Sequence, residues 1–214
     1  MIIGLIPSRL NSTRLRNKPL LEIDGLPIIV HTLKRAQLSK KLDRVIVCTD
    51  SKRIVEVVKK NGGEAIMTSK NHKNGTERIA EVAKKFNPKL IINVQGDEPL
   101  VDPKDIDKVI DFHIKNKNFD IVVPSMISKV NSKSQNLVKV VFSETGKILY
   151  FSRALIPHDF KNNKPIYFKD LSIVSFLPKA LQKFSKTKMG KLEKIEGIEL
   201  LRALEIDLNL GTFV

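Results

Sequence analysis

The chain has 214 residues, 42% of them hydrophobic, and its 38 Lys and Arg against 23 Asp and Glu give a formal net charge of +15. This length suits one domain with a sizeable core, and the apolar content excludes a disordered chain. The single cysteine excludes a disulfide framework. No apolar run approaches the ~20 residues of a membrane span. The N-terminus lacks the basic region of a signal peptide, so we expect a cytoplasmic protein without membrane insertion.

The positive charge is spread along the chain rather than gathered in one tract. The sequence holds 29 Lys and only 9 Arg, with no Trp and two Tyr. Nucleic-acid-binding surfaces combine a basic tract with aromatic side chains on which bases stack. A nucleic-acid partner would therefore rest on charge alone, and we interpret most of the lysines as surface residues.

Short apolar runs alternate with helical patterns along the first 126 residues. Strands are expected at 2–6, 44–49, 64–67, 89–95 and 121–126, and helices at 27–38, 51–60, 75–86 and 103–115, the last with Asp102 as its N-cap. After this point the pattern predicts paired strands within 137–151, a polar loop at 157–165 and a final helix at 192–206. Nearly continuous apolar strands separated by helices indicate an α/β fold with a Rossmann-like, mainly parallel sheet flanked by helices.

The loop at 7–19 directly follows the first predicted strand. Ligands of such sheets bind beyond the carboxyl ends of the strands, and this loop matches neither a Walker A motif nor a GxGxxG turn. It concentrates basic side chains, among them Arg9, Arg14 and Lys18, with hydroxyl groups such as that of Ser12. Charge-assisted hydrogen bonds contribute about 1.5–3 kcal/mol each, so the loop could hold a triphosphate. An ordinary solvated basic loop would have the same composition.

Two further polar segments follow apolar runs. Asp97 closes the most apolar strand, where a carboxylate is costly unless it meets a cation, and it is a candidate Mg²⁺ ligand. Beside it, Gln95 offers a donor and an acceptor, and Gly96 permits close approach of a ligand. The segment at 74–78 begins a predicted helix, where free amides favour anions or base edges. Each segment could also be an ordinary turn or a capped helix start.

Taken in order, stretches along nearly the whole chain carry a family resemblance. They lie at 6–9, 12–15, 18–20, 25–28, 44–50, 75–78, 93–99, 136–141, 150–157 and 192–196. Together they resemble the opening signature and the later motifs of the 3-deoxy-manno-octulosonate cytidylyltransferases. Sialic-acid cytidylyltransferases share the fold but open with a different loop, so they are the second candidate.

The resemblance implies a nucleotidyltransferase fold in a single domain over 1–214, with an antiparallel excursion at 125–180 for dimerisation and sugar binding. It implies a Mg²⁺-dependent reaction of CTP with a 3-deoxy sugar acid that gives a CMP-sugar and pyrophosphate for lipopolysaccharide or surface polysaccharide synthesis. The site residues that it implies are Arg9, Arg14, Lys18 and Asp97 for catalysis; Arg9, Ser12, Arg14, Lys18, Gly75, Arg78 and Gln95 for the nucleotide; Gln95, Arg153 and Glu196 for the sugar acid; and Asp97 for the metal.

Three departures from the family pattern qualify this expectation. Asp170 and Val174 stand where the family has a histidine and a tyrosine of the sugar pocket, and Leu200 replaces a glutamine. A related sugar acid is therefore an open alternative. The family also continues to a Val-Asp-Thr-Pro-Glu-Asp segment that carries a second metal aspartate, whereas this sequence ends at Val214. We accordingly expect a C-terminally short chain, with a catalytically impaired nucleotide-binding protein as the alternative from another class.

Overall fold

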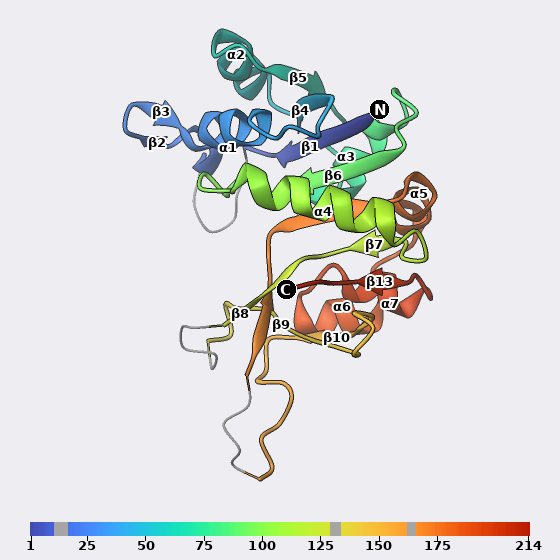
Figure 1. Ribbon diagram of the computed structural model, residues 1–214. Coiled ribbons are helices and arrows are strands. Elements are labelled where there is room, and N and C mark those ends of the chain that lie inside the picture. The colour runs from blue at the N-terminus through green and yellow to red at the C-terminus, as the bar shows by residue number, and fades with distance from the viewer. Residues whose placement is uncertain (11–16, 129–133, 162–165) are drawn as a thin grey trace.

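The computed structural model describes residues 1–10, 17–128, 134–161 and 166–214. Its centre is a seven-stranded sheet in the order β13-β7-β12-β6-β1-β4-β5 (Figure 1). The strands of this sheet are β1 (Ile2–Ser8), β4 (Arg44–Thr49), β5 (Glu64–Met67), β6 (Leu90–Val94), β7 (Ile121–Val122), β12 (Ile173–Phe176) and β13 (Leu210–Gly211). β1 pairs in parallel with both β4 and β6, while β12 runs antiparallel to β6 and β7. The predicted α/β fold with a mainly parallel sheet is confirmed.

Helices cover both faces of this sheet. They are α1 (Ile28–Gln37), α2 (Lys52–Lys60), α3 (Gly75–Ala83), α4 (Pro103–Lys115), α5 (Pro178–Lys186), α6 (Lys191–Glu196) and α7 (Leu201–Glu205), together with a 3-10 helix, η1 (Lys18–Leu20). Buried residues of α1, α2 and α4 form one core, and those of α3, α5 and α7 form the other. The alternation of β1 serves both cores, since Ile3 and Leu5 join the second and Ile6 the first. No helix in the described ranges is long and apolar enough to cross a membrane.

A second sheet extends away from this body (Figure 1). Its four strands, in the order β10-β9-β11-β8, are β8 (Ser125–Ile127), β9 (Lys139–Phe142), β10 (Ile148–Ser152) and β11 (Phe168–Asp170). A small hairpin, β2 (Glu22–Ile23) with β3 (Leu26–Pro27), precedes α1. The four-stranded sheet lies within the expected excursion at 125–180, whereas β12 and α5, which begin inside the same range, belong to the main layers.

Two elements that were each predicted as continuous are divided in the structure, so both predictions are wrong in this respect. The single strand expected at 121–126 is divided, with β7 in the main sheet and β8 in the second sheet. Pro124 lies at the division, and proline cannot donate to a ladder hydrogen bond. The single helix expected at 192–206 is two helices, because Gly197 between them adopts a left-handed conformation (φ 63°) and ends α6. By contrast, the helix at 103–115 is confirmed, and its Asp102 cap accepts a hydrogen bond from the Lys104 amide.

Candidate active site

The order in which the chain adds strands to the sheet reverses beside β1. The chain adds β4 and β5 on one side of β1 and then β6 on the other, so the switch point lies between β1 and β6. Here the two strand ends nearly touch, since a Cβ on Gly96 would lie 2.6 Å from the Pro7 carbonyl oxygen. Gly75, at the start of α3, packs on the same proline. The three segments expected to carry chemistry therefore meet at one place, as the parallel sheet requires.

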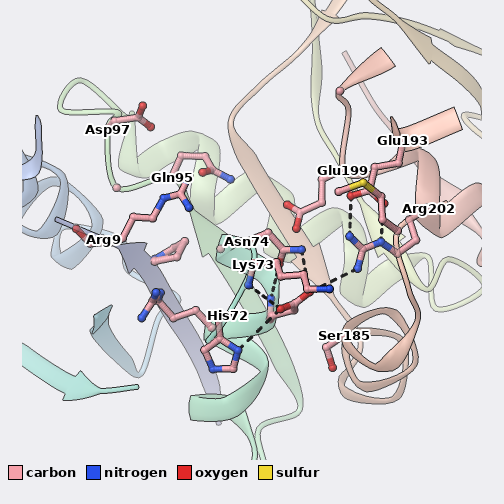
Figure 2. A pocket seen from close by; sticks show the side chains of 18 of the residues that line it. Arg9, His72, Lys73, Asn74, Gln95, Asp97, Ser185, Glu193, Glu199 and Arg202 are labelled. Carbon is pink, nitrogen blue, oxygen red and sulfur yellow. Dashed lines mark hydrogen bonds and ion pairs between the residues drawn. The ribbon is translucent and has the colours of Figure 1, made fainter. Parts of the chain in front are cut away.

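A cavity of about 810 Å³ opens at this switch point. Figure 2 shows Arg9, Gln95 and Asp97 on one side of it and Glu193, Glu199 and Arg202 on the opposite side, with residues of the α3 start between them. Of the expected site residues, the lining includes Arg9, Lys18, Gly75, Arg78, Gln95 and Asp97. Ser12 and Arg14 lie outside the described residues, so their roles stay predictions from sequence.

Lys18 and Asp97 join the loops that follow β1 and β6. The Lys18 Nζ lies 2.5 Å from Asp97 Oδ2, and the two side chains are 36% and 52% exposed. Asp97 therefore pairs with an ammonium group at the mouth of the cavity. Arg9, on the first of these loops, is exposed and faces the same space.

This mouth of the cavity suits a nucleotide-bound Mg²⁺. Among the described residues there is no group of three or more His, Cys, Asp or Glu side chains that could hold a metal ion by itself. Mg²⁺ needs no such group beside a nucleotide, because it keeps several waters and takes phosphate oxygens with one or two carboxylates. Asp97, which already attracts an ammonium group, fits as the carboxylate of such a site.

Arg78, which was expected to contact the nucleotide, is buried, and its guanidinium group is bonded to other protein groups. Its side chain is 3% exposed, and Nη2 donates to Asp50 Oδ2 over 2.8 Å. Nη1 donates to the Thr68 hydroxyl and to the Ser69 carbonyl oxygen. The guanidinium therefore links the ends of β4 and β5 to α3, and these bonds fix the position of the cavity wall at the start of α3. Asn74 caps the same helix by accepting from the Glu77 amide over 2.8 Å.

The wall opposite Asp97 was not expected from the sequence. Arg202 is 2% exposed and donates through Nε and Nη2 to the two carboxylate oxygens of Glu193 over 2.7 and 2.6 Å. These bonds to Glu193 raise the pKa of Arg202 above its usual value. Ser8, at the end of β1, also lines the cavity, and its buried hydroxyl has no hydrogen-bond partner. That hydroxyl is free to serve a ligand.

Glu199 lines the same wall with an acid group that favours its neutral form. Its buried Oε1 has no hydrogen-bond partner, and burial raises the pKa of the carboxyl from 4.5 to about 7, although Thr76 bonds to it and Arg202 lies nearby. A protonated carboxyl can donate a hydrogen bond into the cavity near neutral pH.

The raised pKa of Glu199 has a consequence for stability. Between pH 4.5 and 7 the unfolded chain loses this proton before the folded one, so ionisation opposes folding increasingly as pH rises through that window. We expect Glu199→Gln to stabilise the protein by about 1–3 kcal/mol at pH 8, with the gain vanishing near pH 4.5. Urea unfolding across this range measures the difference. The exposed Glu56→Gln is the control, and a gain for E199Q that does not change with pH would contradict the prediction.

Of the three residues expected to bind the sugar acid, only Gln95 lines the cavity. Arg153 and Glu196 do not line the cavity, and their side chains bond to each other's segments and to backbone groups. Asp170 ends β11 with a pKa that burial raises to about 6, Val174 lies buried in β12, and Leu200 precedes α7. None of these three lines the described cavity either.

The mostly parallel sheet and its switch-point cavity define an α/β fold of the class that binds nucleotides beyond the carboxyl ends of its strands. A family model described as cytidylyltransferase matches residues 3–210. The 3-deoxy-manno-octulosonate cytidylyltransferase of Fusobacterium nucleatum is 43% identical, with 95% of this chain and 84% of that protein covered. The one from Thermodesulfovibrio yellowstonii is 42% identical, with 97% and 88% covered. The chain belongs to the family of 3-deoxy-manno-octulosonate cytidylyltransferases, as its sequence motifs led us to expect.

A solved structure supports the same assignment at the level of the fold. It is that of a CMP:2-keto-3-deoxy-manno-octonic acid synthetase complexed with CTP, and it superposes with a TM-score of 0.94 at 34% identity. The match covers 99% of this chain and 88% of that one. A Leptospira borgpetersenii cytidylyltransferase, at 21% identity and a TM-score of 0.66, shares the fold.

Proposed function

We propose that the protein transfers a cytidylyl group from CTP to a 3-deoxy sugar acid, with 3-deoxy-manno-octulosonate as the first candidate. The observation that carries this proposal is the meeting of Lys18 and Asp97 at the mouth of a large switch-point cavity. In the reaction the anomeric oxygen forms a bond to the α-phosphorus, and the bond to the bridging oxygen of pyrophosphate breaks. The hydroxyl proton passes to solvent. The product would serve lipopolysaccharide or surface polysaccharide synthesis.

The basic residues beside β1 have the chemistry to hold the triphosphate. Arg9 and Lys18 face the cavity, and Arg14 and Ser12 join them by motif position. Their charge would stabilise the transition state, because negative charge moves toward the leaving pyrophosphate as the bond breaks. A Mg²⁺ ion, when bound, neutralises phosphate charge and favours ionisation of the attacking hydroxyl. Asp97 would hold it.

The start of α3 and the end of β6 suit the nucleoside. Gly75 and Gln95 line the cavity. The free amides at the start of α3 and the amide group of Gln95 offer donors and an acceptor to cytosine and ribose. Arg78 would act on the base through the strand ends that it ties to α3.

The apolar residues exposed on the second sheet support a homodimer. Met126 and Ile127 on β8 and Leu149 on β10 are 38%, 42% and 57% exposed. They lie on the two edge strands of a small sheet, and exposed apolar groups on such an excursion favour cover by another subunit. We propose that two copies associate through this excursion. A molar mass near that of one 24.2 kDa chain in light scattering would contradict it.

The activity can be tested by pyrophosphate release from CTP in the presence of Mg²⁺. We expect release to depend on an added 3-deoxy sugar acid, and a panel should include 3-deoxy-manno-octulosonate and its relatives, because Asp170, Val174 and Leu200 depart from the family pattern. Sialic acid is the control substrate for the second candidate family. CTP binding without release from any acid would instead favour a nucleotide-binding protein. A location in the cytoplasm, where CTP is made, follows from the proposal.

A further inference from the structure

The guanidinium group of Arg153 is occupied by backbone carbonyl groups. Nε donates to the Glu196 carbonyl over 2.8 Å, Nη1 to that of Gln135 over 2.9 Å and Nη2 to that of Gly197 over 3.2 Å. Two of these acceptors lie at the C-terminal end of α6, where unpaired carbonyls and the helix dipole favour a cation. In this arrangement Arg153 holds three chain segments together, and three of its five N–H groups are directed to their carbonyls.

The carboxylate of Glu196 reinforces the same junction. It accepts from the Ser152 hydroxyl over 2.7 Å and from the Arg153 amide over 2.9 Å. The end of β10 and the end of α6 are thus bound reciprocally, through the side chain of each and the backbone of the other. Such a closed set of charge-assisted bonds fixes the relative position of two elements.

Lys139 holds this junction from inside the second sheet. Its side chain is fully buried, and Nζ donates to the carbonyls of Ser134, Leu137 and Arg153 over 2.7, 2.9 and 2.6 Å. Burial lowers the pKa of this lysine. A buried ammonium is costly unless its three donors are used. Here one donor fixes the backbone of Arg153, and the other two fix Ser134 and Leu137 in the segment whose Gln135 carbonyl accepts from Arg153.

The junction lies directly before the cavity wall that faces Asp97. After Glu196 the chain turns through Gly197, whose positive φ ends α6, and Glu199 and Arg202 then line the cavity. We refer to the cavity-lining residues Glu193, Glu199 and Arg202 as the acidic wall. Its course is set by where α6 ends, and the end of α6 is fixed by Arg153.

We propose that Lys139, Arg153 and Glu196 are positioning residues that hold the acidic wall in place, rather than groups that bind the sugar acid. The proposal rests on the proposed function for its kinetic consequences. It assigns a role to Lys139 that the sequence motifs did not suggest. It also replaces the role expected for Arg153 and Glu196, and it couples the second sheet to the nucleotide cavity.

The proposal can be tested by hydrogen exchange in the protein without substrates. We expect Arg153→Gln and Lys139→Met to increase exchange in 193–202, with Arg153→Lys in between because it keeps one donor group on the carbonyls. We also expect them to weaken CTP binding about tenfold in calorimetry without any sugar acid, since a displaced wall reshapes the whole cavity. Arg35→Gln is the matched control, because Arg35 Nε also donates to a backbone carbonyl, that of Val101, on the other face of the sheet.

A direct role of Arg153 in sugar-acid binding predicts a different result. If Arg153 binds the sugar carboxylate directly, R153Q will raise the KM for the sugar acid alone, leaving CTP affinity and exchange in 193–202 unchanged, and the proposal will be overturned. Should R153Q or K139M not fold, the milder Glu196→Gln and Ser152→Ala variants weaken the same junction and carry the same expectation. Absence of turnover in the unmodified protein would refute the proposed function while leaving the exchange result to decide the positioning role.

Discussion

The Asp97→Asn variant is expected to bind CTP but to release pyrophosphate about a hundred- to a thousandfold more slowly than the unmodified protein. Asparagine keeps the shape of the side chain and removes the charge that holds a cation at the cavity mouth. Because Lys18 then loses its partner, CTP binding measured without metal should not weaken. Steady-state kinetics and calorimetry separate the two effects.

Lys18 provides the reciprocal half of this prediction. The Lys18–Asp97 pair is partly exposed, and exposed pairs contribute about 0.2–1 kcal/mol. Lys18→Met should therefore raise the affinity of the nucleotide-free protein for Mn²⁺ by about two- to fivefold. The electron paramagnetic resonance signal of free Mn²⁺ measures this affinity. The same variant should bind CTP more weakly. Opposite shifts in the two affinities would show that Lys18 competes with the metal for Asp97 and serves the nucleotide once CTP is present.

A matched control guards against a general effect of removing acid groups. Asp102→Asn makes the same change five residues after Asp97, at the exposed N-cap of α4, where asparagine caps as well as aspartate. Its turnover should equal that of the unmodified protein. Turnover of D97N within a few fold of that value would contradict the role of Asp97.

The convergence of the loops at the cavity could be predicted from the sequence because a parallel sheet brings the carboxyl ends of its strands to one edge. Nearly continuous apolar runs predicted β1 and β6, and polar residues that follow these two strands, including Arg9 and Asp97, do line one cavity. Gly96 was expected to admit a ligand; what its missing side chain permits in the fold is close approach to the Pro7 carbonyl.

The acidic wall could not be predicted in the same way. Its position depends on the break between α6 and α7 at Gly197, and the helical pattern of 192–206 concealed that break. The partners of Arg153 and Lys139 are mainly backbone carbonyls, which every residue has, so no sequence pattern marks them. The family resemblance alone therefore led to Arg153 as a ligand of the sugar acid, whereas in the fold three of its N–H groups are directed to backbone carbonyls.

The buried pair of Arg202 and Glu193 is expected to be the ion pair on which folding depends most among those described. Both side chains are nearly inaccessible, and the two bonds between them are of 2.7 and 2.6 Å. Arg202→Met would leave the Glu193 carboxylate buried without its partner, so we expect a loss of about 3–5 kcal/mol in the free energy of unfolding. Urea denaturation measures this loss.

A double variant and a surface pair make this prediction specific. Combining R202M with Glu193→Gln removes the uncompensated charge, so the double variant should recover part of the stability lost in R202M. Arg44 and Glu64 form a similar two-point pair that is about 40% exposed on each side, and Arg44→Met should cost no more than about 1 kcal/mol. If R202M costs as little as R44M, or if E193Q deepens its loss, the acidic wall is not held by this charge pair, and the coupling of α6 to α7 must come from the apolar contacts of α7 instead.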